Sequence, residues 1–127
     1  MGDRANFGFK QGEDTIYLYG HWAGQNMMAK LAKALNRVLE AGRINDPAYA
    51  TRICISDLTA DSHATDLGWG ITVNSISDNE HSVPVVNFEN ETVSLYDFDY
   101  GYNLLTTTPK VTFSVGNFIR KYGKVLV

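Results

Sequence analysis

The sequence predicts an α+β fold in which a mostly antiparallel β-sheet carries two helices on one face. Period-two alternation over residues 14–19 leads into a glycine-bounded corner at 20–24, and a period of about 3.6 residues follows. Short runs in which apolar and polar residues alternate, separated by turn residues, then fill most of the second half of the chain. The chain has 127 residues, of which 44% are hydrophobic and 20% charged, as expected for one globular domain over residues 1–127.

The expected element order is β-β-α-α-β-β-β, followed by a weak strand and a short C-terminal helix. The first two strands are expected over residues 7–9 and 15–19, because the turn-forming residues 11–14 separate two aromatic and β-branched runs. In the second strand both faces carry large side chains, which indicates that both are partly covered.

The first helix is expected over residues 25–41, with Gly42 as its C-cap. Its apolar residues recur three and four positions apart and form one stripe, made of Met28, Leu31, Leu35, Val38 and Leu39. The second helix is expected over residues 47–58, because Asp46 is a capping residue and Pro47 suits the first helical position. We expect it to bury Tyr49, Ala50, Ile53, Cys54 and Leu58.

The remaining strands are expected over residues 69–73, 83–88, 92–98 and 110–113, with a helical end over 117–122. The strand that begins at Thr92 contains a conflict of phase. Val93 and Leu95 set one phase, and an aromatic row, Tyr96, Phe98, Tyr100 and Tyr102, sets the opposite one. A single strand cannot turn both sets inward, so we expect a bulge near Tyr96 or a strand that leaves the sheet.

The aromatic row has two interpretations. It covers the edge of the core after a bend in the chain, or it forms a surface for a partner, since tyrosine is enriched at protein interfaces.

His21 and Trp22 lie at the strand-to-helix corner, and Glu80 and His81 lie in the turn over residues 77–81. If the turn faces the corner, His21, Glu80 and His81 are candidates for an acid–base or metal site, because imidazole titrates near neutral pH. The alternative is that His21 binds a loop carbonyl, Trp22 closes the end of the core and residues 77–81 form a turn only.

A second polar cluster, Asp57, Asp61, His63 and Asp66, follows the second helix. Carboxylates and an imidazole can bind a divalent metal, but the spacing lacks the glycine and terminal glutamate of a calcium loop, which favours a solvated loop. The glycines at 68 and 70 fit neither a dinucleotide fingerprint nor a phosphate-binding loop. Cys54 lies on the apolar side of its helix and is expected to be an inert thiol. We therefore expect no cofactor.

Charge and composition restrict the partners. The net charge is −3 and the basic residues are spread along the chain, so nucleic acid is not expected as a partner. No apolar run approaches the length of about 20 residues that a membrane helix needs, and no membrane partner is expected. The single cysteine fits a reducing compartment, so the expected location is the cytoplasm.

Four segments, residues 1–6 (MGDRAN), 17–22 (YLYGHW), 68–70 and 78–80, resemble in order those of a group of small uncharacterised proteins of bacteriophages and some bacteria. The resemblance implies an accessory phage protein in a bacterial cytoplasm. Such proteins often bind a host protein or sequester a small molecule, and the resemblance carries no site residues with it.

Three functional hypotheses follow. The first is a non-enzymatic protein that binds a host protein or forms a homo-oligomer, with the aromatic row as its contact surface. The second is a small metal-dependent hydrolase that uses one of the two polar clusters. The third is a nucleotide or signal-molecule binder that uses Arg4, Arg52 and Trp69, because guanidinium and aromatic groups suit phosphate and base recognition.

Overall fold

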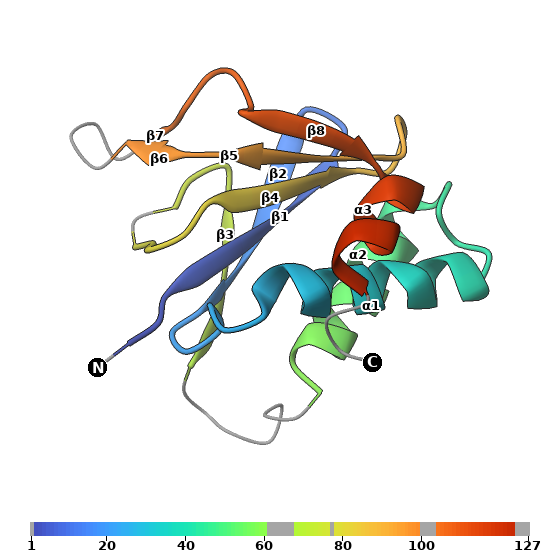
Figure 1. Cartoon of the computed structure of the whole chain (residues 1–127), viewed down its shortest axis with the longest axis horizontal. Coiled ribbons are helices and arrows are strands. Elements are labelled where there is room, and N and C mark those ends of the chain that lie inside the picture. Colours follow the sequence, from blue (N-terminus) through green and yellow to red (C-terminus); the bar gives the residue numbers. More distant parts are fainter. Residues whose placement is uncertain (1, 61–67, 77, 100–103, 124–127) are drawn as a thin grey trace.

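The computed structural model describes residues 2–60, 68–76, 78–99 and 104–123 and has an α+β fold (Figure 1). The helices are α1 (Met27–Glu40), α2 (Pro47–Leu58) and α3 (Val115–Tyr122). The strands are β1 (Ala5–Gln11), β2 (Asp14–Gly20), β3 (Trp69–Val73), β4 (Val83–Asn87), β5 (Thr92–Tyr96), β6 (Phe98–Asp99), β7 (Leu104–Leu105) and β8 (Val111–Ser114). Six of these strands form one sheet in the order β3-β2-β1-β4-β5-β8.

The sheet is mixed, so the expectation of a mostly antiparallel sheet was wrong. β1 and β4 run parallel at its centre, where Gly8 pairs with Val85, and the other four pairings are antiparallel. β2 occupies one side of β1. The other side of β1 is filled by β4, which the chain reaches only after α1, α2 and β3. The side chains of β4 are buried from Val83 to Val86, as is typical of a central strand covered on both faces.

The helices lie together on one face of the sheet (Figure 1), where the main hydrophobic core is formed. Phe7 and Phe9 of β1 point into this core, together with Leu18 of β2. A smaller cluster lies on the other face and consists of Tyr17, Ile76, Val83 and Val85, with Tyr96, Phe98 and Leu105 packed against it. The sheet is therefore covered on both faces near its centre.

The apolar stripe of α1 is confirmed at its centre, where Leu31, Leu35 and Val38 are fully buried. Leu39 was predicted to be buried but is exposed, because it lies at the margin of the stripe. None of the helices in the described segments is long and apolar enough to cross a membrane.

The start of α2 is confirmed, since the Asp46 carboxylate accepts a hydrogen bond from the Tyr49 N–H at 3.3 Å. The prediction that Tyr49 is buried was wrong. The helix turns Ala50 and Cys54 toward the core, which leaves Tyr49 51% exposed, with its ring beneath the Arg43 guanidinium.

The phase conflict after Leu95 is resolved by a strand that leaves the sheet. β5 ends at Tyr96, and β6 pairs with β7 in a separate two-stranded sheet that extends past the end of β5 (Figure 1). Val93 and Leu95 thus face the main core, while Tyr96 and Phe98 pack on the smaller cluster.

Candidate functional site

A group of polar side chains lies where three segments of the chain meet: the N-terminal segment, the corner after β2 and the segment before β4. We call this group the polar cluster, and it consists of Asp3, Arg4, Tyr19, His21, Asp78, Glu80 and His81.

Main-chain hydrogen bonds hold the three segments in place. The Asp3 N–H donates to the His21 carbonyl at 2.8 Å, and the Gly24 N–H donates to the Asp3 carbonyl at 3.0 Å. On the other side, the Glu80 N–H donates to the Arg4 carbonyl at 2.9 Å. The N-terminal segment therefore lies between the corner and the segment before β4.

Gly24 is needed for this close approach. A Cβ at this position would collide with the Asp3 carboxylate and the His81 ring.

Arg4 is held by two carboxylates. Its Nε donates to Glu80 at 3.0 Å, and its Nη1 lies 3.1 Å from Asp78. Glu80 also accepts from the Arg4 main-chain N–H at 2.9 Å. The hydrogen bond with Glu80 raises the pKa of Arg4, and the main-chain and side-chain donors of Arg4 lower the pKa of Glu80. The Glu80 carboxylate is thus ionised at neutral pH, and it is engaged by the two hydrogen bonds from Arg4.

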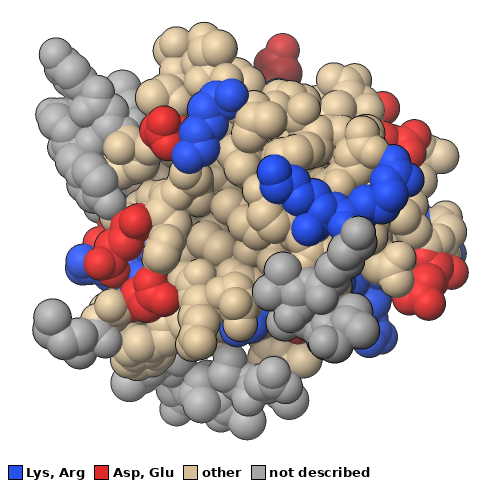
Figure 2. All heavy atoms as spheres, viewed as in Figure 1, with Lys and Arg blue, Asp and Glu red and all other residues tan. Residues whose placement is uncertain are grey.

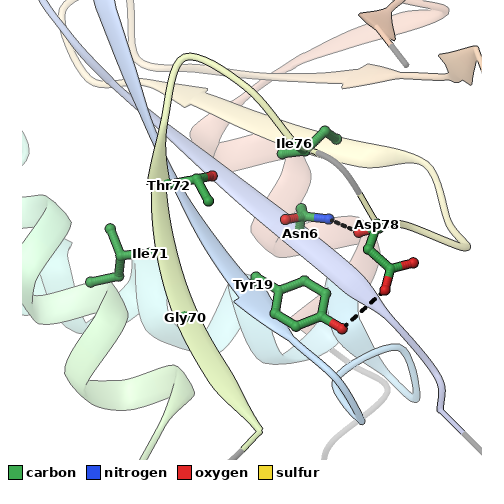
Figure 3. A pocket seen from close by; sticks show the side chains of 7 residues that line it. All are labelled: Asn6, Tyr19, Gly70, Ile71, Thr72, Ile76 and Asp78. Carbon is green, nitrogen blue, oxygen red and sulfur yellow. Dashed lines mark hydrogen bonds between the residues drawn. The ribbon is translucent and has the colours of Figure 1, made fainter. Parts of the chain in front are cut away.

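The two histidines of the polar cluster have different partners. His81 Nε2 lies 2.5 Å from an Asp3 carboxylate oxygen, whereas His21 Nδ1 lies 3.0 Å from the Tyr19 hydroxyl. The Tyr19 hydroxyl also lies 3.5 Å from Asp78 (Figure 3). Burial and the negative charge of Asp78 raise the pKa of Tyr19, so its phenol stays protonated and is a poor nucleophile at neutral pH.

The predicted site His21, Glu80 and His81 is thus brought into one neighbourhood, but each side chain binds a different residue. Within the described residues, no group of three or more His, Cys, Asp or Glu side chains is arranged to hold a metal ion. The polar cluster combines three carboxylates with one guanidinium and two imidazoles, and each carboxylate is paired with one of these groups.

Three members of the polar cluster, Asp3, Tyr19 and Asp78, were not among the predicted site residues, although Asp78 lies in the turn over residues 77–81 that was considered for a site. Tyr19 had a usable signal, because it lies two residues before His21 and alternation places both side chains on one side of the chain. Asp3 had none, since its position depends on contacts between distant segments.

A groove of about 300 Å³ adjoins the polar cluster on the sheet face opposite the helices (Figure 3). Tyr19 and Asp78 point toward one another across it, and the Asn6 amide donates to the Asp78 carbonyl at 2.8 Å. The other lining residues are Gly70, Ile71, Thr72 and Ile76. Asp78 is the charged residue among those that line the groove, and its carboxylate lies 3.1 Å from the Arg4 guanidinium.

The edge of the sheet at β3 exposes apolar side chains. Trp22, Ile71 and Val73 are 61%, 60% and 58% exposed, and we call them the β3 edge strip. The indole of Trp22 packs beside Gly68, where a Cβ would lie 3.0 Å from the ring, and Ile71 and Val73 belong to β3 itself. The strip therefore follows the outer strand of the sheet.

The remaining predicted binding residues are dispersed. Tyr96 and Phe98 are half-buried against the smaller cluster, and Tyr100 and Tyr102 lie outside the described residues, so the aromatic row as a partner surface stays a prediction. Trp69 packs against the main core and Arg4 belongs to the polar cluster, whereas Arg52 lies exposed on α2 beside Ser56.

Of the second polar cluster, only Asp57 is among the described residues, and it pairs with Arg37 at 3.5 Å. Asp61, His63 and Asp66 lie outside them, and the metal site there stays a prediction. Cys54 is fully buried, and burial raises the pKa of its thiol to about 12, in agreement with an inert thiol.

Figure 2 shows the Lys and Arg side chains of one face at separate places around a largely uncharged centre.

No protein-family model matches the chain, and neither the curated proteins nor the solved structures include a significant match. A functional proposal must therefore come from the geometry of this chain.

Proposed function

We propose that this chain is a non-enzymatic binding protein that associates with another protein through the β3 edge strip. The observation that carries the proposal is the exposure of Trp22, Ile71 and Val73 along an outer strand. Edge strands with exposed apolar side chains are sites where another chain can add to a sheet.

The polar cluster supports a binding role over a catalytic one. Arg4 and Glu80 bind one another, His81 binds Asp3, and His21 binds Tyr19. These contacts join the N-terminal segment to two other segments, which places the corner that carries Trp22 beside β3. We assign the polar cluster the task of holding this corner rather than acting on a substrate.

The resemblance to phage proteins suggests the setting. In this proposal the chain acts in the cytoplasm of an infected bacterium, and its partner is a host protein or a second copy of itself.

The test is native mass spectrometry of the tagged protein captured from bacterial lysate. Wild type is compared with Ile71→Lys, which places a charge on the β3 edge strip, and with Val111→Lys, which makes the same change on β8, the other edge strand. We expect a stoichiometric partner with wild type and with Val111→Lys, and its loss with Ile71→Lys. A partner that survives Ile71→Lys, or the absence of both partner and self-association, contradicts the proposal.

A further inference from the structure

The direction of the main-chain groups of β3 follows from two hydrogen bonds. The Asn74 N–H donates to the Thr15 carbonyl at 2.8 Å, and the His21 N–H donates to the Gly68 carbonyl at 2.8 Å. Hydrogen-bonded pairs alternate along an antiparallel ladder, so Gly70 and Thr72 also turn their main-chain groups toward β2. The N–H and C=O groups of the odd-numbered positions 71 and 73 therefore point outward, away from the sheet.

The side chains of these same positions lie on the face that carries the helices. Ile71 pairs with Leu18, which points into the main core, and cross-strand partners share a face. In Figure 3, Ile71 projects from the opposite side of β3 to Thr72. The helices leave this part of the sheet uncovered, since Ile71 and Val73 are more than half exposed.

The sequence of β3 also lacks the residue types that often protect an edge strand. This sequence, WGITV, contains no charge and no proline, and all five residues pair with β2 in unbroken register.

We propose that the occupant of this edge is β3 of a second copy of the chain, paired antiparallel about a two-fold axis at Ile71. In this register Ile71 pairs with Ile71 of the second copy, and Trp69 pairs with Val73. The Ile71 pair at the axis uses outward-pointing N–H and C=O groups, and residues so paired exchange two hydrogen bonds. The proposal rests on the proposed function and names its partner.

The second copy fits the edge for three reasons. A partner strand must offer outward main-chain groups at alternate positions, and β3 does so at positions 71 and 73. It must bring apolar side chains to the helix-bearing face, and the two-fold axis places those of both copies together there. It must not bring like charges together, and the strand is uncharged.

The dimer is expected to be weak. One pair of five-residue strands buries less than the roughly 1,200 Å² of a stable interface. We therefore expect concentration-dependent association with a Kd in the micromolar range or weaker, of order 10⁻⁶ M.

The first test is a charge swap at the two-fold axis, read by sedimentation equilibrium over a wide concentration range. Ile71→Lys and Ile71→Glu each place like charges opposite one another, and each should weaken the dimer at least about tenfold. Mixing the two variants should restore association, because the axis then sets Lys against Glu. Val111→Lys is the matched control and should associate as wild type does.

The second test is disulfide trapping with Ile71→Cys. Residues in a hydrogen-bonded antiparallel pair have Cα atoms about 5.5 Å apart, which lies within the range that a disulfide spans. We expect a covalent dimer under mild oxidation, and none with Val111→Cys. Cys54 does not compete, because it is fully buried.

Circular dichroism separates misfolding from loss of the interface, and the cysteine variant keeps the test valid if a charged variant fails to fold. The inference is overturned if the wild type stays monomeric. It is also overturned if the wild type dimerises and the substitutions at residue 71 do not change the dissociation constant. If the wild type is monomeric while a lysate partner is still lost with Ile71→Lys, the inference fails and the proposed function stands. If neither association occurs, both fail.

Discussion

Replacing Phe118 by alanine tests whether α3 is part of the core. Phe118 is fully buried, and its ring centroid lies 5.9 Å from that of Phe113 and 4.8 Å from that of Tyr122. α3 has 8 residues, and an isolated helix of that length is unstable in water. Packing against the core must therefore hold it in place.

The expected loss of unfolding free energy is about 3–5 kcal/mol, the range for truncating a buried phenylalanine to alanine. The total stability of a domain of this length is about 6–19 kcal/mol. The variant should thus fold but unfold at a clearly lower urea concentration, by about 2 M for an m-value near 2 kcal/mol/M.

The assay is urea unfolding followed by far-UV circular dichroism, with Gly116→Ala as the control. Gly116 lies in the same helix, and a Cβ there meets no atom within 4 Å. Because alanine favours the helix, the control should gain up to about 1 kcal/mol. If Phe118→Ala loses less than about 1 kcal/mol, which is far below the range for a buried phenylalanine, then α3 does not pack as described.

Three further predictions concern the polar cluster and the core. Gly24→Ala should displace the Asp3–His81 pair and lower the unfolding free energy by about 1–2 kcal/mol; histidine NMR signals report the change, and an unshifted His81 signal would contradict the close approach. The folded pKa of Glu80 is lowered, so its stabilising contribution is present above the unfolded pKa of about 4.3 and disappears as pH falls through the folded pKa. The unfolding free energies of wild type and Glu80→Gln should therefore differ at pH 6 and converge in acid, whereas a gap that does not change with pH would argue against the Arg4 contacts. Cys54 should react with a thiol reagent at pH 8 only as the chain unfolds, because burial raises its pKa to about 12; rapid labelling of the native protein would show that the thiol is accessible.

Local features of the chain were predictable from the sequence. The Asp46–Pro47 start of α2 and the buried centre of α1 were predicted correctly, because capping and 3.6-residue periodicity depend only on neighbouring residues. The break after Leu95 was also visible, since the aromatic residues change phase there. Tyr49 and Leu39 were misplaced because both lie at the margin of an apolar stripe, where the direction of the packed helix decides burial.

The candidate site was predictable only in part. His21, Glu80 and His81 were singled out as chemically capable residues, and the tertiary structure brings all three into the polar cluster. Their partners were not predictable, because Asp3 is 78 positions from His81 and Arg4 is 76 positions from Glu80. No sequence pattern joins residues at such separations.

The sequence by itself determined the α+β class, the start of α2 and the residues able to bind or react, since these follow from composition, spacing and local hydrogen bonding. The tertiary structure alone decided the parallel pairing of β1 with β4 and the mutual binding of the polar side chains. It also placed β3 at an outer edge with Ile71 and Val73 exposed. The reason is physical: alternation specifies which residues of a strand share a face, whereas the choice of neighbouring strand depends on how the whole chain buries its apolar surface.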